Sequence, residues 1–209
     1  MATLEKSARK RLSREARRRL LEALTYETHD AKPVYYRGYK KALRRELEPE
    51  AIMGSGYEQS FLISLILRFL FSNLPKNYQV LTNEIGLLYG KGEWKAADIA
   101  IFERSQLQGI EKTNRYLPVP PKVVIEVDTK ADLEGFGSEM NYCFQKTQTL
   151  LDFGVEKVIW FFTSSKKAMQ AERGKDWTIS DWNATVSLLG AIHFSLDNLI
   201  RDAEQNDDA

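Results

Sequence analysis

Two apolar segments on either side of a helical stretch place the strongest constraint on the fold. Residues 122–129 (KVVIEVDT) and 154–165 (GVEKVIWFFTSS) are rich in Val, Ile and aromatic residues, which favour β-strands. Between them, the apolar residues near 139–153 recur at helical spacing: Met140, Cys143, Phe144, Leu150 and Leu151. A strand, a helix and a second strand in this order predict a right-handed crossover between parallel strands.

Further strands and helices are expected on both sides of this unit. Residues 78–89 and 95–103 are predicted strands joined by a glycine turn, and residues 167–182 predict a hairpin. Upstream, Ser55 precedes Glu58 by three residues, the spacing of a capping box, at the start of a predicted helix that is apolar on most sides. The sequence therefore predicts an α/β fold in which helices flank a mixed β-sheet.

The N-terminal part of the chain is strongly basic. Residues 4–24 predict a helix with one narrow stripe of Leu and Ala and with cationic remaining faces. Residues 1–48 hold 14 Lys/Arg and 7 Asp/Glu, whereas residues 49–209 hold 16 and 22. This asymmetry indicates an anionic partner such as a phosphate backbone, but a solvated helix docked by its stripe explains it as well. We expect three parts, namely a basic helix at 1–24, a main domain at 25–197 and a polar tail at 198–209.

The composition disfavours several classes of protein. Cys143 is the only cysteine, which excludes an internal disulfide framework and a Cys-rich zinc site. His29 and His193 lie far apart and lack the spacing of metal ligands. The longest apolar run, 61–71, is too short to cross a bilayer and contains Arg68. Because no signal peptide is visible either, we expect a cytoplasmic protein without a membrane partner.

Two predicted strands carry carboxylates where apolar residues are usual. Alternation places Glu126 and Asp128 on one face of their strand, and Asp98 lies in the middle of AADIAIF, where its β-propensity is poor. If the two strands pair, Asp98 and Glu126 converge. Buried carboxylates are unfavourable unless they are paired or bound to metal, and such oxygen ligands suit Mg²⁺ or Mn²⁺. That chemistry supports phosphodiester cleavage beside a cation, for which Lys130 and Lys146 are the candidates.

The ordered set of these residues resembles the PD-(D/E)xK nuclease superfamily. More narrowly, VVIEVDT followed by FQKTQTLLDFGVEKVIWFF is similar to the characteristic stretch of a restriction endonuclease family that is abundant in cyanobacterial genomes. That stretch has an apolar strand ending in EV, a helix with a lysine, and then GV-E-x-x-W. The segments PVYYRGYKKAL and AIMGSG also look like the N-terminal part of that family, so that the resemblance covers roughly residues 25–195.

The resemblance implies a restriction-endonuclease-like fold with a Mg²⁺ (or Mn²⁺) site. In that family the acidic residues matched by Asp98 and Glu126 bind the ion, together with a backbone carbonyl that would here be that of Val127. The helical lysine, matched by Lys146, positions or activates the attacking water.

The sequence departs from the superfamily motif at two positions. Ala97 stands where the motif has proline, which is a small change. Asp128 stands where the motif has its lysine, so the lysine has to come from the helix, as Lys146, or from Lys130. Asp128 is then a candidate for binding a second ion or orienting water. Glu58, in the first helix of the predicted domain, is a further candidate metal ligand besides its capping role.

Two functions are consistent with these residues. The first is a Mg²⁺-dependent endonuclease that binds and hydrolyses DNA, with a homodimer expected because a duplex has two strands to cut. The second is a catalytically silent domain that keeps the nuclease fold and binds DNA or another partner. The aspartate at the motif lysine position favours the second function, and the sequence does not distinguish DNA from RNA.

Overall fold

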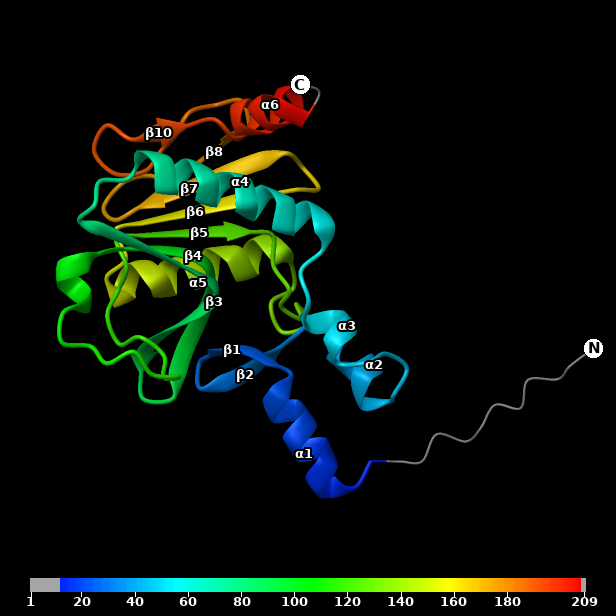
Figure 1. Ribbon diagram of the computed structural model, residues 1–209. Helices are drawn as coiled ribbons and strands as arrows, with labels where there is room; N and C mark the ends of the chain where they lie inside the picture. Colours follow the sequence, from blue (N-terminus) through cyan, green and yellow to red (C-terminus); the bar gives the residue numbers. More distant parts are fainter. Residues whose placement is uncertain (1–11, 208–209) are drawn as a thin grey trace, which may run out of the picture.

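The computed structural model describes residues 12–207 and contains a six-stranded sheet (Figure 1). Its strands lie in the order β3–β4–β5–β6–β7–β8, which is also their order along the chain. β5 and β6 pair in parallel, which confirms the predicted strand–helix–strand unit, and the other neighbouring strands are antiparallel. The strand bounds are Tyr78–Gly90 for β3, Glu93–Glu103 for β4, Val123–Val127 for β5, Lys157–Phe162 for β6, Lys167–Glu172 for β7 and Thr178–Asp181 for β8.

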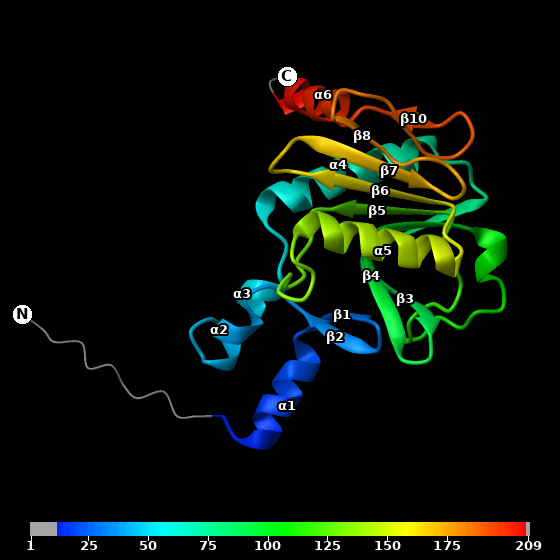
Figure 2. The same ribbon diagram turned by 180° about the vertical axis from the view of Figure 1, so that it is seen from behind.

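Helices cover both faces of this sheet. α5 (Glu139–Phe153) lies on one face, and α4 (Tyr57–Asn73) lies on the opposite face with α6 (Leu196–Asp207) beside it (Figures 1 and 2). α5 begins where the hydroxyl of Ser138 accepts a hydrogen bond of 3.1 Å from the backbone N–H of Asn141. This cap satisfies one of the helix donors that have no partner within the helix. The arrangement confirms the predicted fold class, a mixed α/β sheet flanked by helices.

The capping box predicted at the start of α4 is wrong. The helix begins at Tyr57 and its N-cap is Gly56, without a side-chain hydrogen bond, so Ser55 lies outside it. The helix is also less buried than predicted, because Tyr57 and Phe71 are exposed. Its buried residues form one face: Leu62, Leu65, Ile66 and Leu70.

The region before α4 contains a small hairpin that the sequence did not predict. Residues 25–35 form two antiparallel strands whose Tyr26 and Val34 are buried. β1 lies against β4, since the backbone N–H of Trp94 donates a hydrogen bond of 2.7 Å to the hydroxyl of Thr28. The elements here are α1 (Arg14–Ala23), β1 (Thr25–His29), β2 (Lys32–Tyr35), α2 (Tyr39–Leu43) and α3 (Glu50–Met53). The first part of the predicted basic helix lies outside the described residues.

The segment expected as a polar tail at 198–209 is helical up to residue 207, and its last two residues lie outside the described part of the chain. α6 continues to Asp207, with Leu196 and Ala203 buried and Leu199 and Ile200 packed against the core. An amphipathic stripe of four apolar residues is enough to dock a helix that is otherwise polar. The remaining short elements are the 3₁₀ helix η1 (Arg104–Leu107), β9 (Val186–Ser187) and β10 (His193–Phe194).

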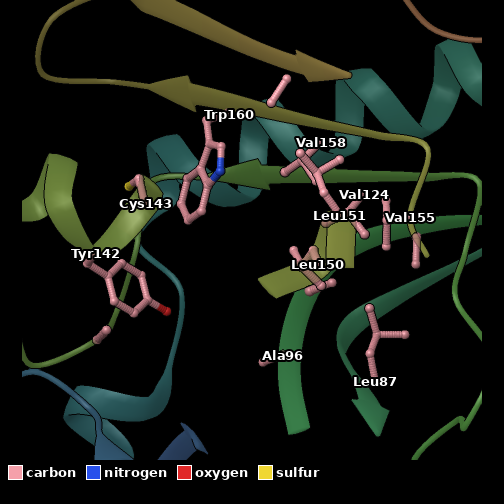
Figure 3. Close-up of a cluster of buried hydrophobic side chains, with 14 of the residues drawn as sticks. Leu87, Ala96, Val124, Tyr142, Cys143, Leu150, Leu151, Val155, Val158 and Trp160 are labelled. Atoms are coloured by element: carbon pink, nitrogen blue, oxygen red, sulfur yellow. The ribbon is translucent and has the colours of Figure 1, made fainter. Parts of the chain in front are cut away.

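The core has two parts, one on each face of the sheet. The α5-face core includes Val124, Val158 and Trp160 of the sheet and Tyr142, Cys143, Leu150 and Leu151 of α5 (Figure 3). The α4-face core includes Ile99, Ile101, Ile125, Ile159 and Phe161 of the sheet and Leu62, Ile66 and Leu70 of α4. Across residues 12–207, none of the helices has both the length and the apolarity needed to span a bilayer.

Candidate active site

Asp98 and Glu126 lie on adjacent strands and on the same face of the sheet. Ile99 of β4 pairs with Ile125 of β5, and continuing this antiparallel register sets Asp98 opposite Glu126. Side chains on opposed positions of neighbouring strands lie close together. The alternation follows the prediction, because the isoleucines face α4 whereas the two carboxylates share the face of Val124, towards α5.

Asp98 is tied to the end of β5 through the backbone. Its Oδ2 accepts a hydrogen bond of 2.9 Å from the N–H of Val127. The carbonyl of Val127 accepts a hydrogen bond of 2.8 Å from Nε2 of Gln59, which also lies 3.5 Å from Oδ2 of Asp98. The carboxylate of Asp98, the carbonyl of Val127 and the amide of Gln59 therefore meet at one point between β4, β5 and α4.

Sequence reasoning selected Glu58 from this helix and missed Gln59. The Glu58 side chain is exposed and forms an ion pair of 3.2 Å with Lys166, whereas Gln59 reaches the strand end. The phase of the helix relative to the sheet decides which of two consecutive residues faces inward. The sequence does not reveal this rotation, so it could not show that Gln59 rather than Glu58 reaches the site.

Lys146 is buried at the centre of the α5 face. Its Nζ lies 3.0 Å from Oε1 of Glu126 and 3.2 Å from Oε2 of Glu27 in β1. Three aromatic rings surround the ammonium at 5.3, 5.5 and 5.9 Å from their centres, and they belong to Tyr26, Trp160 and Tyr142. Such rings stabilise a cation through their quadrupoles. Of the two candidate lysines, Lys146 is therefore the one that contacts Glu126.

Glu27 and Lys95 are site residues that sequence reasoning missed. Oε1 of Glu27 lies 3.0 Å from Nζ of Lys95, and both side chains are completely buried. Glu27 therefore contacts Lys95 through one oxygen and Lys146 through the other. A lysine next to the apolar stretch AADIAIF was a possible signal, but its partner lies 68 residues away in the chain.

The open side of Asp98 is a pocket of about 320 Å³ between β3, β4 and α4. It is lined by Asp98, by Asn83 and Glu84 of β3, and by the serines Ser55, Ser60 and Ser64. Asn83 and Glu84 have φ angles of +72° and +55° and interrupt the β3–β4 ladder. Glu84 accepts a hydrogen bond of 2.6 Å from the hydroxyl of Tyr36 and is ion-paired with Lys130. Lys130, the other candidate for the catalytic lysine, is therefore paired with Glu84.

Asp128 is bound to the loop after β6. Its Oδ1 accepts a hydrogen bond of 2.8 Å from the backbone N–H of Thr163, and its Oδ2 accepts one of 2.6 Å from the Thr163 hydroxyl. Its φ of +57° shows that the strand conformation ends at this residue. Both oxygens are therefore used to fasten a turn, and these bonds give no support to the predicted role in binding a second ion or water.

The electrostatics of the site are those of charges taken out of water. Burial raises the pKa of Glu126 to about 8, an effect that Lys146 opposes and that Asp98 increases. Burial also raises the pKa of Asp98, against the hydrogen bond from Val127. Burial by itself lowers the pKa of Lys146, but Glu126 and Glu27 hold that pKa well above its ordinary value. Lys146 is therefore charged, whereas burial favours the protonated form of both Asp98 and Glu126.

These donors fit a hard divalent cation. Both oxygens of Glu126 are buried; Oε1 is ion-paired with Lys146, whereas Oε2 lacks a hydrogen bond from the described residues. The carbonyl of Val127 keeps a second acceptor position beside Gln59. No group of three or more His, Cys, Asp or Glu side chains that could hold a metal ion occurs in residues 12–207. The site therefore fits an ion that is held by Asp98, Glu126, the Val127 carbonyl and water molecules. Mg²⁺ accepts such a set of oxygen ligands.

Comparisons with known proteins bear on the fold. No protein-family model matches the sequence, and no curated protein matches it significantly. Among solved structures, the chain is similar to a protein from Anabaena variabilis ATCC 29413 described as a “putative nuclease belonging to DUF820”. The two share 14% sequence identity with a TM-score of 0.58, over 70% of this chain and 82% of that one. The likeness shows a nuclease-like fold.

Proposed function

We propose that this protein is a divalent-metal-dependent nuclease that hydrolyses phosphodiester bonds in DNA. The observation that carries the proposal is the placement of Asp98 beside the end of β5 at Val127, opposite Glu126 on the same sheet face, with Lys146 in contact with Glu126. The similar fold of the Anabaena protein, whose description names a nuclease, supports the same reaction class. Dimerisation stays a prediction.

Each residue has a distinct part in this proposal. Asp98, Glu126 and the carbonyl of Val127 would hold Mg²⁺ or Mn²⁺, which when bound supplies an activated water and neutralises charge on the phosphate. Lys146 donates from its ammonium and so orients a water on the Glu126 side. Gln59 keeps the Val127 carbonyl in place through its 2.8 Å hydrogen bond. The pocket beside Asp98 is the side from which a phosphodiester can approach.

Nicking of supercoiled plasmid tests this function. We expect nicking by the wild-type protein that requires Mg²⁺ or Mn²⁺ and stops with a chelator. Asp98→Asn and Glu126→Gln are each expected to slow nicking by roughly 1000-fold, since a metal site supplies several kcal/mol of transition-state stabilisation. Glu58→Gln is the matched control, because it removes an exposed carboxylate of the neighbouring helix, and it is expected to nick at the wild-type rate.

The catalytically silent alternative gives a different pattern. In that case the wild type and all variants show the same background of nicking, and Mn²⁺ titration shows no binding that depends on Asp98 and Glu126. Binding of a labelled DNA duplex without cleavage would then identify a DNA-binding domain. Metal binding that both variants abolish, with cleavage of RNA but not of DNA, would keep the chemistry and change the substrate.

A further inference from the structure

A second buried ion pair stands behind the residues of the proposed site. Glu27 of β1 and Lys95 of β4 are completely buried. One carboxylate oxygen of Glu27 lies 3.0 Å from Nζ of Lys95, and the other lies 3.2 Å from Nζ of Lys146. With Glu126, these residues form a chain of alternating basic and acidic side chains, in the order Lys95, Glu27, Lys146 and Glu126. The chain connects the β1–β2 hairpin, β4, α5 and β5. None of the roles assigned above uses Glu27 or Lys95.

The polar contacts that hold the ammonium of Lys146 belong to this chain of ion pairs. The ammonium lies among three aromatic rings, and its polar contacts are with Glu126 at 3.0 Å and Glu27 at 3.2 Å. A lysine side chain is flexible and presents a point charge, so one carboxylate alone would fix the position of the ammonium less firmly than two. Two carboxylates on different elements restrict it to the space between them.

Buried ion pairs also call for an explanation on energetic grounds. A buried ion pair is often no more stabilising than apolar residues of the same volume, whereas removing one partner is strongly destabilising. The site therefore gains little stability from Glu27 and Lys95 that an apolar pair could not supply. An apolar pair could not, however, hold the charged ammonium of Lys146 in place.

We propose that Glu27 is a positioning residue for Lys146. It holds the ammonium from the side opposite Glu126, and Lys95 keeps the charge of Glu27 balanced without competing for the same oxygen. A cation on Glu126 would repel the lysine, and Glu27 is the carboxylate that retains it. The catalytic consequence rests on the proposed nuclease function, whereas the positioning of Lys146 does not.

Side-chain NMR tests the positioning without any enzymatic activity. In protein labelled with ¹⁵N-lysine, a buried and paired ammonium gives a ¹H–¹⁵N signal because its protons exchange slowly, and loss of one signal in Lys146→Met assigns it. We expect this signal to persist in Glu58→Gln, whose lost carboxylate pairs with the exposed Lys166, and to shift or broaden beyond detection in Glu27→Gln. An unchanged Lys146 signal in Glu27→Gln would overturn the proposal.

A kinetic cycle tests the consequence for catalysis. In Glu27→Gln we expect kcat to fall by roughly 10- to 100-fold with KM within about twofold of wild type, as for a misplaced catalytic group. In the Lys146→Met background, Glu27→Gln is expected to cause no further loss, because its effect passes through the lysine. Losses that multiply, or a rise in KM at unchanged kcat, would contradict the proposal.

A second variant separates positioning from folding. Glu27→Gln/Lys95→Met removes one charge of each sign and leaves the Lys146–Glu126 pair intact, so it is expected to fold even if Glu27→Gln does not. The same signal and the same kinetic cycle are then measured in this double variant. An inactive wild type with an Lys146 signal that depends on Glu27 would reject the nuclease function and keep the positioning.

Discussion

The two faces of the central sheet use the same strands for opposite purposes. On the α4 face, β4, β5 and β6 contribute Ile99, Ile125 and Phe161 to an apolar core. On the α5 face, one residue away along the same strands, Asp98 and Glu126 are almost as deeply buried. Strand alternation therefore gives the α4 face an apolar core and the α5 face an apolar core that also contains buried charged side chains.

The difference between the faces lies in where each residue finds its partners. An apolar side chain of the α4 face is satisfied by any well-packed neighbour of suitable volume. Each charge on the α5 face needs one particular group from another element, as Lys146 of α5 needs both Glu126 of β5 and Glu27 of β1. Substitution of these charges is thus expected to affect function, whereas substitution in the apolar core of the α4 face is expected to affect stability alone. Three predictions test this comparison.

The largest expected effect on stability concerns the apolar face. Phe161→Ala is expected to lower the free energy of unfolding by about 3 to 5 kcal/mol, because it leaves a cavity beneath α4 where the side chain is fully buried. Chemical denaturation measures this change, and Mn²⁺ titration of the folded variant is expected to match wild type. A loss below about 1 kcal/mol would show that this face is loosely packed.

An intermediate effect concerns the pH dependence of the charged face. The pKa of Glu126 is raised to about 8 in the folded protein, so the folded state binds a proton more readily than the unfolded chain. The contribution of Glu126 to metal-free stability should therefore be fully present below its unfolded pKa and be lost as the pH rises towards 8. Between about pH 5.5 and about pH 7.5 the expected loss is roughly 2 to 3 kcal/mol.

Glu126→Gln isolates this contribution, because the amide cannot ionise. Denaturation curves across the same pH range are expected to show a flatter dependence for the variant than for wild type. Equal slopes in the two proteins would show that Glu126 is already ionised in the folded state throughout this range, held so by Lys146.

The smallest expected effect concerns the end of β5. Asp128→Asn keeps the shape of a side chain that tolerates a positive φ but weakens the bonds to Thr163, so the expected loss of stability is about 1 kcal/mol. Thermal unfolding and plasmid nicking are measured together. Lower stability with retained nicking assigns Asp128 to the turn, whereas unchanged stability with lost nicking would return it to the proposed catalytic set.

Much of the fold follows from local patterns in the sequence. The apolar runs around β5 and β6 and the helical spacing between them predict a parallel pair. Alternation predicts that Asp98 and Glu126 converge if their strands pair, and β4 and β5 do pair. These features are predictable because they depend on residues within a few positions of each other. The resemblance implied a helical lysine at the site, and Lys146 does contact Glu126.

Only the tertiary structure decided the remaining partners of the site. Glu27 belongs to a hairpin that the sequence did not predict, and its burial depends on β1 lying against β4 and on two lysines from distant segments. Gln59 rather than Glu58 faces the strands because packing sets the rotation of α4. The sequence by itself determined which strands and faces carry the carboxylates. Which charges meet them depended on long-range packing, because an ion pair between distant segments leaves no periodic trace in either one.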